Sequence, residues 1–277
     1  MPTPAAVLTV AAVDSAGGAG VHADLRAFTA LGLHGASAVA ALTAQSTLGI
    51  HGVHLVPADF VAAQIDAVVS DLRIRATKTG FLGAAPVVRD VGALAAADRL
   101  GPVVVDPVLV GATGERLFGP AVEAAYLEVL LPQATVATPN RVEAGLLVGR
   151  PVRTVADMAD AAVDLAALGP ALVVVKGGDA DDEDDRAVDV VADGDGLVEE
   201  LVMPRIETGN DHGSGCSFSA AVAAGLAVGT APLDAVRAAK RFVHAGLGSA
   251  AGWRLGAGHG PVDAFAGLDG FAWEMEE

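Results

Sequence analysis

The sequence predicts an α/β fold in which helices cover a central, mostly parallel β-sheet. Apolar runs about as long as buried strands alternate with longer segments of helical periodicity. Such alternation is typical of parallel strands that are joined by crossover helices. With 277 residues, 52% of them hydrophobic, the chain can bury a sizeable core, and we expect one domain over residues 1–277.

The expected strands are short apolar runs bounded by polar or glycine-rich residues. They lie at residues 7–13, 36–42, 103–105, 134–137 and 172–175. Residues 187–192 and 197–202, separated by an Asp-Gly turn, predict a hairpin that breaks the alternation once. The acidic stretch 179–185 cannot pack and is expected to be a solvated loop.

The expected helices follow from apolar spacing and capping residues. Residues 57–72 place apolar side chains at steps of three and four. Thr154 followed by Asp157 resembles a capping box for a helix that ends before Gly169 and Pro170. Two further helices are expected in the C-terminal third, over residues 215–228 and from 232 to about 250.

Charge and cysteine content exclude several classes of protein. A net charge of −17 disfavours binding to nucleic acid and to anionic membranes. No apolar run approaches the roughly 20 residues of a spanning helix, and no basic leader precedes the first apolar stretch. A single cysteine, Cys216, forms neither an internal disulfide nor a multi-cysteine metal site. We therefore expect a cytoplasmic protein.

The first glycine-rich turn follows the first strand, at residues 14–20. Gly18, Gly20 and Ala23 fit the pattern G-x-G-x-x-A of dinucleotide-binding turns, and backbone amides there are expected to face a ligand. The acidic residue that would hold the ribose is missing, because no carboxylate occurs between Asp24 and Asp59. The sequence therefore argues against a dehydrogenase.

The second glycine-rich turn, at residues 210–217, precedes a helix of small residues. Free amides and the macrodipole at such a helix start would stabilise a phosphoryl group in transfer. An ordinary glycine-rich turn remains the alternative on this motif alone. All three lysines of the chain, Lys78, Lys176 and Lys240, lie in or beside candidate ligand-binding segments. Lys176 ends a strand, where it can meet a nucleotide phosphate.

Two carboxylates follow neighbouring strands at the expected carboxyl edge of the sheet. Asp106 comes after residues 103–105, and Glu143 follows the next strand. Carboxylate oxygens suit Mg²⁺, which proteins commonly hold through one or two acids plus water and phosphate oxygens. Spacing alone leaves open that Asp106 caps a loop and that Glu143 lies on an exposed helix face.

Taken in order, the segments resemble the hydroxymethylpyrimidine and phosphomethylpyrimidine kinases of thiamine synthesis, over about residues 7–265. The matching stretches are VDSAGGAGVHADLRAF, ALTAQST, ATKTGFLG, VVVDPVLV, TPNRVEA, VVVKGG, NDHGSGCSFSAAVAAGL and GHGPV. The resemblance implies a ribokinase-like three-layer α/β/α fold with a central, mostly parallel β-sheet. It also implies use of ATP with Mg²⁺, a small-molecule substrate and a homodimer.

The resemblance also implies roles for particular residues. The substrate pyrimidine would contact Gln45, Ala19, Val108 and Asp14. The transferred phosphoryl would lie in the turn of Gly213, Ser214, Gly215 and Cys216, with Cys216 as the catalytic base. The nucleotide would contact Lys176, Lys240, Asn140 and Thr208, and the metal would be held by Asp106 and Glu143. The start of the helix is expected to lower the pKa of the Cys216 thiol.

Four positions depart from the family pattern. Ala12 and Val13 stand where Gly and Ser are usual, Phe81 where Met is common, and Ala112 where Lys is common. These changes concern the shape of the substrate pocket. They leave open a pyridoxal- or pyridoxine-type vitamin kinase of the same superfamily, and a non-catalytic homologue that binds a pyrimidine.

Overall fold

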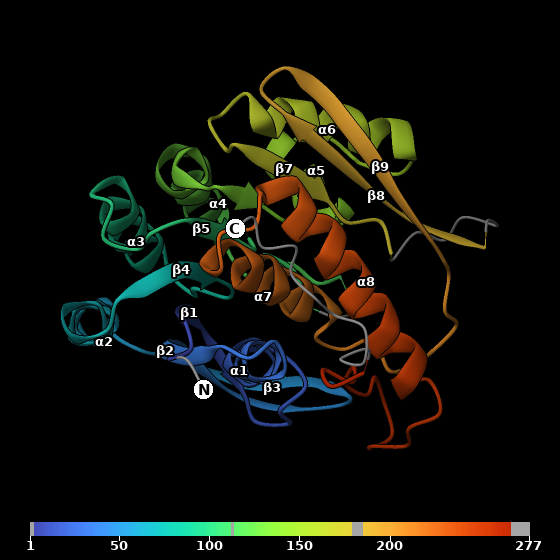
Figure 1. Cartoon of the computed structure of the whole chain (residues 1–277), viewed down its shortest axis with the longest axis horizontal. Coiled ribbons are helices and arrows are strands. Elements are labelled where there is room, and N and C mark those ends of the chain that lie inside the picture. The colour runs from blue at the N-terminus through green and yellow to red at the C-terminus, as the bar shows by residue number, and fades with distance from the viewer. Residues whose placement is uncertain (1–2, 112–113, 179–184, 267–277) are drawn as a thin grey trace.

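The computed structural model describes residues 3–111, 114–178 and 185–266 (Figure 1). Its described part contains one nine-stranded sheet in the order β3-β2-β1-β4-β5-β6-β7-β8-β9. The six central strands of this order, β2, β1, β4, β5, β6 and β7, run parallel to one another. Strand β3 at one edge, and β8 and β9 at the other, join in antiparallel orientation. Their bounds are β1 Ala6–Asp14, β2 His34–Ser46, β3 Gly49–Leu55, β4 Ile74–Thr79, β5 Val103–Val105, β6 Val136–Ala137, β7 Leu172–Val175, β8 Arg186–Asp193 and β9 Gly196–Pro204.

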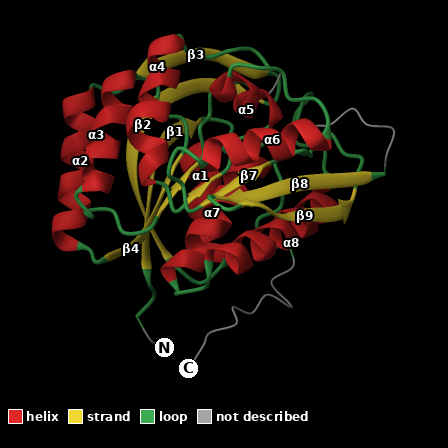
Figure 2. Cartoon of the chain, turned by 90° about the horizontal axis from the view of Figure 1, so that it is seen from above, coloured by secondary structure: helices red, strands yellow, loops and turns green. Residues whose placement is uncertain are grey.

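Helices cover both faces of this sheet (Figure 2). One apolar core joins the sheet to α1, α7 and α8, and a second joins it to α2 through α6. The helices are α1 Gly20–Ala30, α2 Ala58–Asp71, α3 Ala85–Ala96, α4 Pro120–Ala125, α5 Arg141–Val148, α6 Val155–Ala166, α7 Ser214–Ala227 and α8 Pro232–Ala250, with short turns η1 Tyr126–Leu130 and η2 Leu131–Gln133. The predicted three-layer α/β/α architecture is confirmed.

Burial explains why the central strands could be predicted from the sequence. Strands that are covered on both faces are apolar throughout, as in β5 and β7, whose residues are all buried. The predicted hairpin is present as β8 and β9, and Thr154 and Asp157 form the predicted capping box of α6. Most of the acidic stretch 179–185 and Ala112 lie outside the described residues.

The prediction of a single break in the strand-helix alternation is wrong, because β2 and β3 form a second hairpin. Residues of β3 from His51 to Leu55 are exposed, so the strand has no apolar run to reveal it. Strand β4 was also missed, since its sequence IRATKT alternates in polarity although its last four residues are buried. No helix of the described residues is long and apolar enough to cross a bilayer.

Candidate active site

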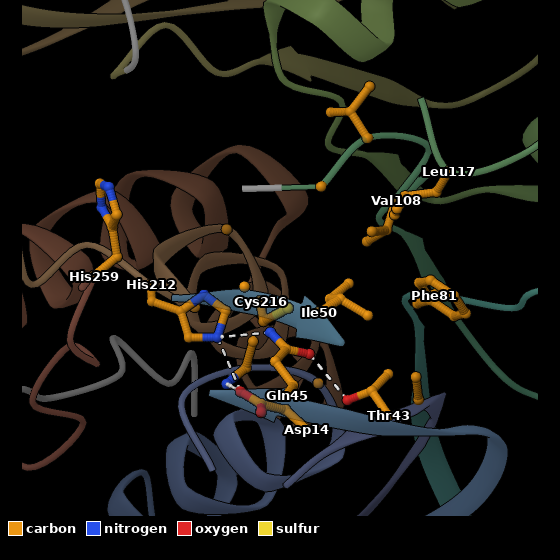
Figure 3. A pocket seen from close by; sticks show the side chains of 18 of the residues that line it. Asp14, Thr43, Gln45, Ile50, Phe81, Val108, Leu117, His212, Cys216 and His259 are labelled. Atoms are coloured by element: carbon orange, nitrogen blue, oxygen red, sulfur yellow. Dashed lines mark hydrogen bonds and ion pairs between the residues drawn. The ribbon is translucent and has the colours of Figure 1, made fainter. Parts of the chain in front are cut away.

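A cavity of about 520 Å³ opens at the carboxyl edge of the sheet, beside the start of α7 (Figure 3). The structure brings together here most of the side chains that the sequence singled out. Those lining the cavity are Asp14, Ala19, Gln45, Asp106, Val108, Asn140, Glu143, Lys176, Gly213, Ser214, Gly215 and Cys216. They come from strand ends and turns that are far apart in the sequence, as expected for a site at the edge of a parallel sheet.

The first glycine-rich turn is closed by Asp14. Its Oδ1 accepts a hydrogen bond from the amide of Ala16 at 2.8 Å, and Oδ2 accepts from Gly18 and Ala19 at 2.9 Å each. Burial would raise the pKa of Asp14, but hydrogen bonds from His212 and these amides outweigh it and lower the pKa. The expectation that these amides face a ligand is therefore wrong, because the turn satisfies them itself.

His212 links this turn to Gln45. Its Nε2 lies 2.9 Å from Asp14 Oδ2 and 3.2 Å from the Gln45 side-chain amide (Figure 3). Of the Gln45 side-chain amide, Nε2 is the atom that faces His212, and Oε1 faces Thr43. The Thr43 hydroxyl donates to Gln45 Oε1 at 2.9 Å and also lies 3.0 Å from the Val13 carbonyl oxygen. Gln45 is thus held by the protein before any substrate arrives.

The opposite wall of the cavity is apolar. The rings of Phe81 and Phe118 meet edge to face with centroids 4.8 Å apart, and Phe81 lines the cavity with Val108 and Leu117 (Figure 3). Ala12 packs in the same small cluster. A flat heterocycle placed here would lie between aromatic or aliphatic carbon and the Gln45 amide, an arrangement suited to ring recognition.

The second glycine-rich turn starts α7 without a side-chain cap. Gly213 occupies the N-cap position with φ of 81°. No described residue accepts a hydrogen bond from the amides of Gly215 and Cys216. A Cβ at Gly215 would lie 3.0 Å from Lys176 Nζ, so the lysine ammonium is next to this helix start. Free amides beside a cation form an anion site.

Cys216 lies at this anion site but is not pre-ionised. Burial raises the pKa of its thiol to about 11, although Lys78 and the Gly20 amide act in the opposite direction. The expectation that the helix start lowers the pKa is therefore wrong for the protein without ligands. Desolvation of a thiolate in a closed environment outweighs the helix dipole.

Asp106 and Lys176 form a buried ion pair at the floor of the cavity. Lys176 Nζ lies 2.9 Å from Asp106 Oδ1, and Ser219 of α7 donates to Oδ2 at 3.1 Å. Burial would lower the pKa of Lys176, but Asp106 and Glu143 outweigh it and raise the pKa. The lysine therefore carries its charge beside the α7 turn.

Glu143 is the N3 residue of the α5 capping box, not an exposed helix residue. Its side chain accepts from the amides of Asn140 and Leu109 at 2.8 and 3.3 Å. Burial raises the pKa of Glu143 to about 7, with Lys176 opposing and the negative charge of Asp106 adding to the rise. The carboxylates of Asp106 and Glu143 both interact with the single charge of Lys176, and two acids beside one lysine fit a divalent cation. No group of three potential ligands occurs in the described ranges, so Mg²⁺ would need nucleotide oxygens or water as further ligands.

Two residues expected at the nucleotide are bonded to other parts of the protein. Lys240 pairs with Asp189 at 2.8 Å, and Asp189 also accepts from the Gly177 amide. Thr208 accepts from the amide of Asn210 in the segment before α7. Neither Lys240 nor Thr208 lines the cavity. Their contact with nucleotide stays a prediction, and the structure links Lys240 through Asp189 to Gly177, the residue after Lys176.

Comparison with known proteins identifies the family of this site. The phosphomethylpyrimidine kinase family matches residues 14–263. The chain belongs to this family. It is 46% identical over 266 residues to hydroxymethylpyrimidine/phosphomethylpyrimidine kinase of Rhizobium meliloti (strain 1021), covering 94% of this chain and 97% of that protein. The predicted family, fold and phosphotransferase class are therefore confirmed.

Solved structures of two vitamin kinases share the fold of this family member. Pyridoxal kinase of Staphylococcus aureus, in complex with AMP-PCP and pyridoxal, superposes with a TM-score of 0.86 at 34% identity, over 96% of this chain and 95% of that one. Phosphomethylpyrimidine kinase of Clostridium difficile 630 has a TM-score of 0.75 at 32% identity, over 87% of this chain and 98% of that one.

The sequence did not single out His212, Thr43 and Phe118. His212 lies inside the second glycine-rich segment, and this position could have indicated that it belongs to the site. Thr43 lies two residues before Gln45 on β2, and its hydroxyl contacts the Gln45 side chain. For Phe118 there was no local signal, because its contact with Phe81 joins segments 37 residues apart.

Proposed function

We propose that this kinase transfers the γ-phosphoryl of ATP to the hydroxymethyl group of 4-amino-5-hydroxymethyl-2-methylpyrimidine, and then phosphorylates the monophosphate, in thiamine synthesis. One observation carries the proposal. A preorganised amide, Gln45, and an uncapped helix start beside Lys176 open into the same cavity. The first suits a flat ring with donors and acceptors, and the second suits a phosphoryl group in transfer.

The ring is bound by groups whose positions are already fixed. The Gln45 amino and carbonyl groups are oriented by His212 and Thr43 respectively, yet each has capacity for one further hydrogen bond. Phe81 and Val108 exclude water from the ring. We expect the site to discriminate between ring systems, because a ring that places a polar group against Gln45 without a hydrogen bond would bind less tightly.

Phosphoryl transfer depends on positioning and on neutralised charge. The amides of Gly215 and Cys216 and the Lys176 ammonium would receive the oxygens of the transferred group. Mg²⁺, held by Asp106 and Glu143, would neutralise charge on the nucleotide phosphates. The proton of the substrate hydroxyl would pass to Cys216 in its thiolate form. The monophosphate presents an ionised oxygen and needs no such base.

An activity panel tests the proposal. Purified protein with ATP and Mg²⁺ should phosphorylate hydroxymethylpyrimidine and its monophosphate faster than pyridoxal or pyridoxine, measured by product chromatography. ATP left unconsumed with all of these acceptors, together with tight pyrimidine binding by calorimetry, would identify a non-catalytic homologue instead. Mass measurement in solution checks the expected homodimer against the 27.5 kDa of one chain.

A pyridoxal-type kinase is the second candidate. The observation that favours it is structural, since the superposition on a pyridoxal kinase has a TM-score of 0.86 against 0.75 for a phosphomethylpyrimidine kinase. Phe81, in place of the common methionine, changes the wall that would contact the ring. A kcat/KM for pyridoxal above that for hydroxymethylpyrimidine would assign the protein to this second function.

A further inference from the structure

An ion pair without exposed surface lies beneath the active site. Lys78 Nζ is 2.9 Å from each carboxylate oxygen of Asp24, and both side chains are 0% exposed. Thr9 donates to Asp24 Oδ2 at 2.6 Å. These three residues come from β4, α1 and β1, and none of them lines the cavity. The proposed transfer reaction therefore leaves them without a role.

The strand register places this ion pair directly under the catalytic groups. Lys78 is aligned with Thr9 on β1 and with Val104 on β5. Asp106, at the cavity floor, follows β5 directly, two residues after Val104. A Cβ on Gly80 would lie 2.9 Å from Lys78 Nζ, so the ammonium reaches toward the carboxyl edge of the sheet.

Helix α1 connects the ion pair to Cys216. Asp24 lies one helical turn after Gly20, the first residue of α1, and Gly20 lines the cavity together with Cys216. Helix α7 packs against α1, β1 and β4. The thiol therefore lies where the starts of α1 and α7 converge above the Lys78 ammonium.

Stability alone does not account for a buried charge pair here. The surrounding core is made of Ala, Val, Leu and Phe side chains, and apolar residues of similar volume often stabilise such a position as well or better. Burial would lower the pKa of Lys78, but the charge of Asp24 outweighs it and raises the pKa. The ammonium thus remains charged at every pH at which the kinase would act.

The charged groups around the thiol differ in sign. Lys78 on β4 and Lys176 just after β7 are positive, whereas Asp24 on α1 and Asp106 just after β5 are negative. Among them Lys78 has the largest effect on the thiol and favours its ionised form. Asp24 holds the ammonium in place, because both of its carboxylate oxygens lie 2.9 Å from Lys78 Nζ.

We propose that Lys78 is a positioning residue for Cys216, whose buried ammonium stabilises the thiolate that accepts the substrate hydroxyl proton. The inference deepens the proposed function and rests on it. The thiol first loses its proton to solvent. The thiolate then takes the hydroxyl proton as the new oxygen-phosphorus bond forms and ADP leaves.

The single cysteine makes the test direct. The rate of alkylation of the folded protein by iodoacetamide reports Cys216 alone, and at a fixed pH below its pKa that rate follows the thiolate fraction. Lys78→Met should lower the rate at pH 9 about tenfold or more and shift the alkylation profile to higher pH. Thr9→Val is the matched control. It removes a buried hydrogen bond but no charge, so the melting temperature should fall while the alkylation profile stays that of the wild type.

A double variant covers a folding defect in Lys78→Met, which leaves Asp24 buried without a partner. Lys78→Met/Asp24→Leu removes both charges, and alkylation should still be slower than in the wild type. Folded variants that alkylate at the wild-type rate would overturn the inference. The assay needs no substrate. Failure to phosphorylate a pyrimidine would therefore refute the proposed function while slower alkylation upheld this inference.

Discussion

Two glycine-rich turns meet at the cavity and use their backbone amides in opposite ways. In the turn of residues 14–20, the Asp14 carboxylate accepts hydrogen bonds from three amides. At the start of α7 no side chain caps the helix, and the amides of Gly215 and Cys216 have no acceptor within the described part of the chain. A high glycine content therefore does not by itself create an anion site. The amides of such a turn are available to an anion only where no carboxylate of the protein accepts hydrogen bonds from them.

The two turns also support each other. The Cα of Gly213 packs against the carbonyl oxygen of Gly18, where a Cβ would overlap with it. His212, just before Gly213, bonds to Asp14. The turn of residues 14–20, whose amides are hydrogen-bonded to Asp14, thus supports the start of α7, whose amides are free. Substitutions in each turn test this division of roles.

The largest effect is expected where the turns touch. Gly213→Ala should destabilise the fold by about 3 kcal/mol and abolish turnover, because alanine is strained at φ of 81° and overlaps with the Gly18 carbonyl. Gly17→Ala is the matched control. Its φ of 76° is similarly strained, but its Cβ would meet only the flexible end of Arg26. A loss of about 1 kcal/mol with activity retained is expected there. Urea unfolding and turnover measure both, and equal losses would contradict the division.

Cys216→Ala removes the proposed base and leaves the helix start in place. Turnover of the alcohol should fall on the order of 10²- to 10⁴-fold, and that of the monophosphate much less. Because burial raises the thiol pKa to about 11, wild-type turnover of the alcohol at subsaturating substrate should rise with pH between 7 and 10. Steady-state assays on both acceptors check this. Equal losses on the two acceptors would mean that the thiol positions substrate and is not a base.

Asp14→Asn tests the closed turn through its pH dependence. The folded pKa of Asp14 lies below its ordinary value of 3.8. The carboxylate therefore contributes stability above that value, and the contribution is lost as pH falls through the folded pKa. The melting temperature of Asp14→Asn should be lower than that of the wild type at pH 5 to 7, and the gap should shrink below about pH 4. A gap that stays constant down to pH 3 would exclude this role.

The smallest effect is expected at Lys240. In the structure its charge is neutralised by Asp189, whereas Lys176 lies beside the α7 turn. Lys240→Met should raise the KM for ATP a few-fold through Asp189 and Gly177, with kcat nearly unchanged. Lys176→Met should reduce kcat by on the order of 10²-fold or more. A larger loss of kcat at Lys240 would restore it as the phosphate contact.

Sequence reasoning predicted the fold where burial is complete. Strands β5 and β7 are apolar because helices cover both their faces, and apolar periodicity located α2. It missed β3, whose exposed residues carry no apolar pattern. The candidate site was assembled mainly through family resemblance, and most of those residues do line one cavity.

The electrostatic details could not be predicted from the chain. The state of the Cys216 thiol depends on burial and on Lys78, 138 residues earlier in the sequence. The sequence of the first turn suggests that its amides are free to bind a ligand, and only the position of the Asp14 side chain shows that they are hydrogen-bonded. Both properties arise from contacts between distant segments, and local patterns do not encode them.

The account depends most on where the transferred phosphoryl binds. A crystal structure with Mg²⁺, ADP, aluminium fluoride and hydroxymethylpyrimidine would show this directly. The expected result places the aluminium fluoride within hydrogen-bonding distance of the Gly215 and Cys216 amides and of Lys176, with the ring on Gln45. Aluminium fluoride bound at residues 16–19, or away from the start of α7, would contradict the account.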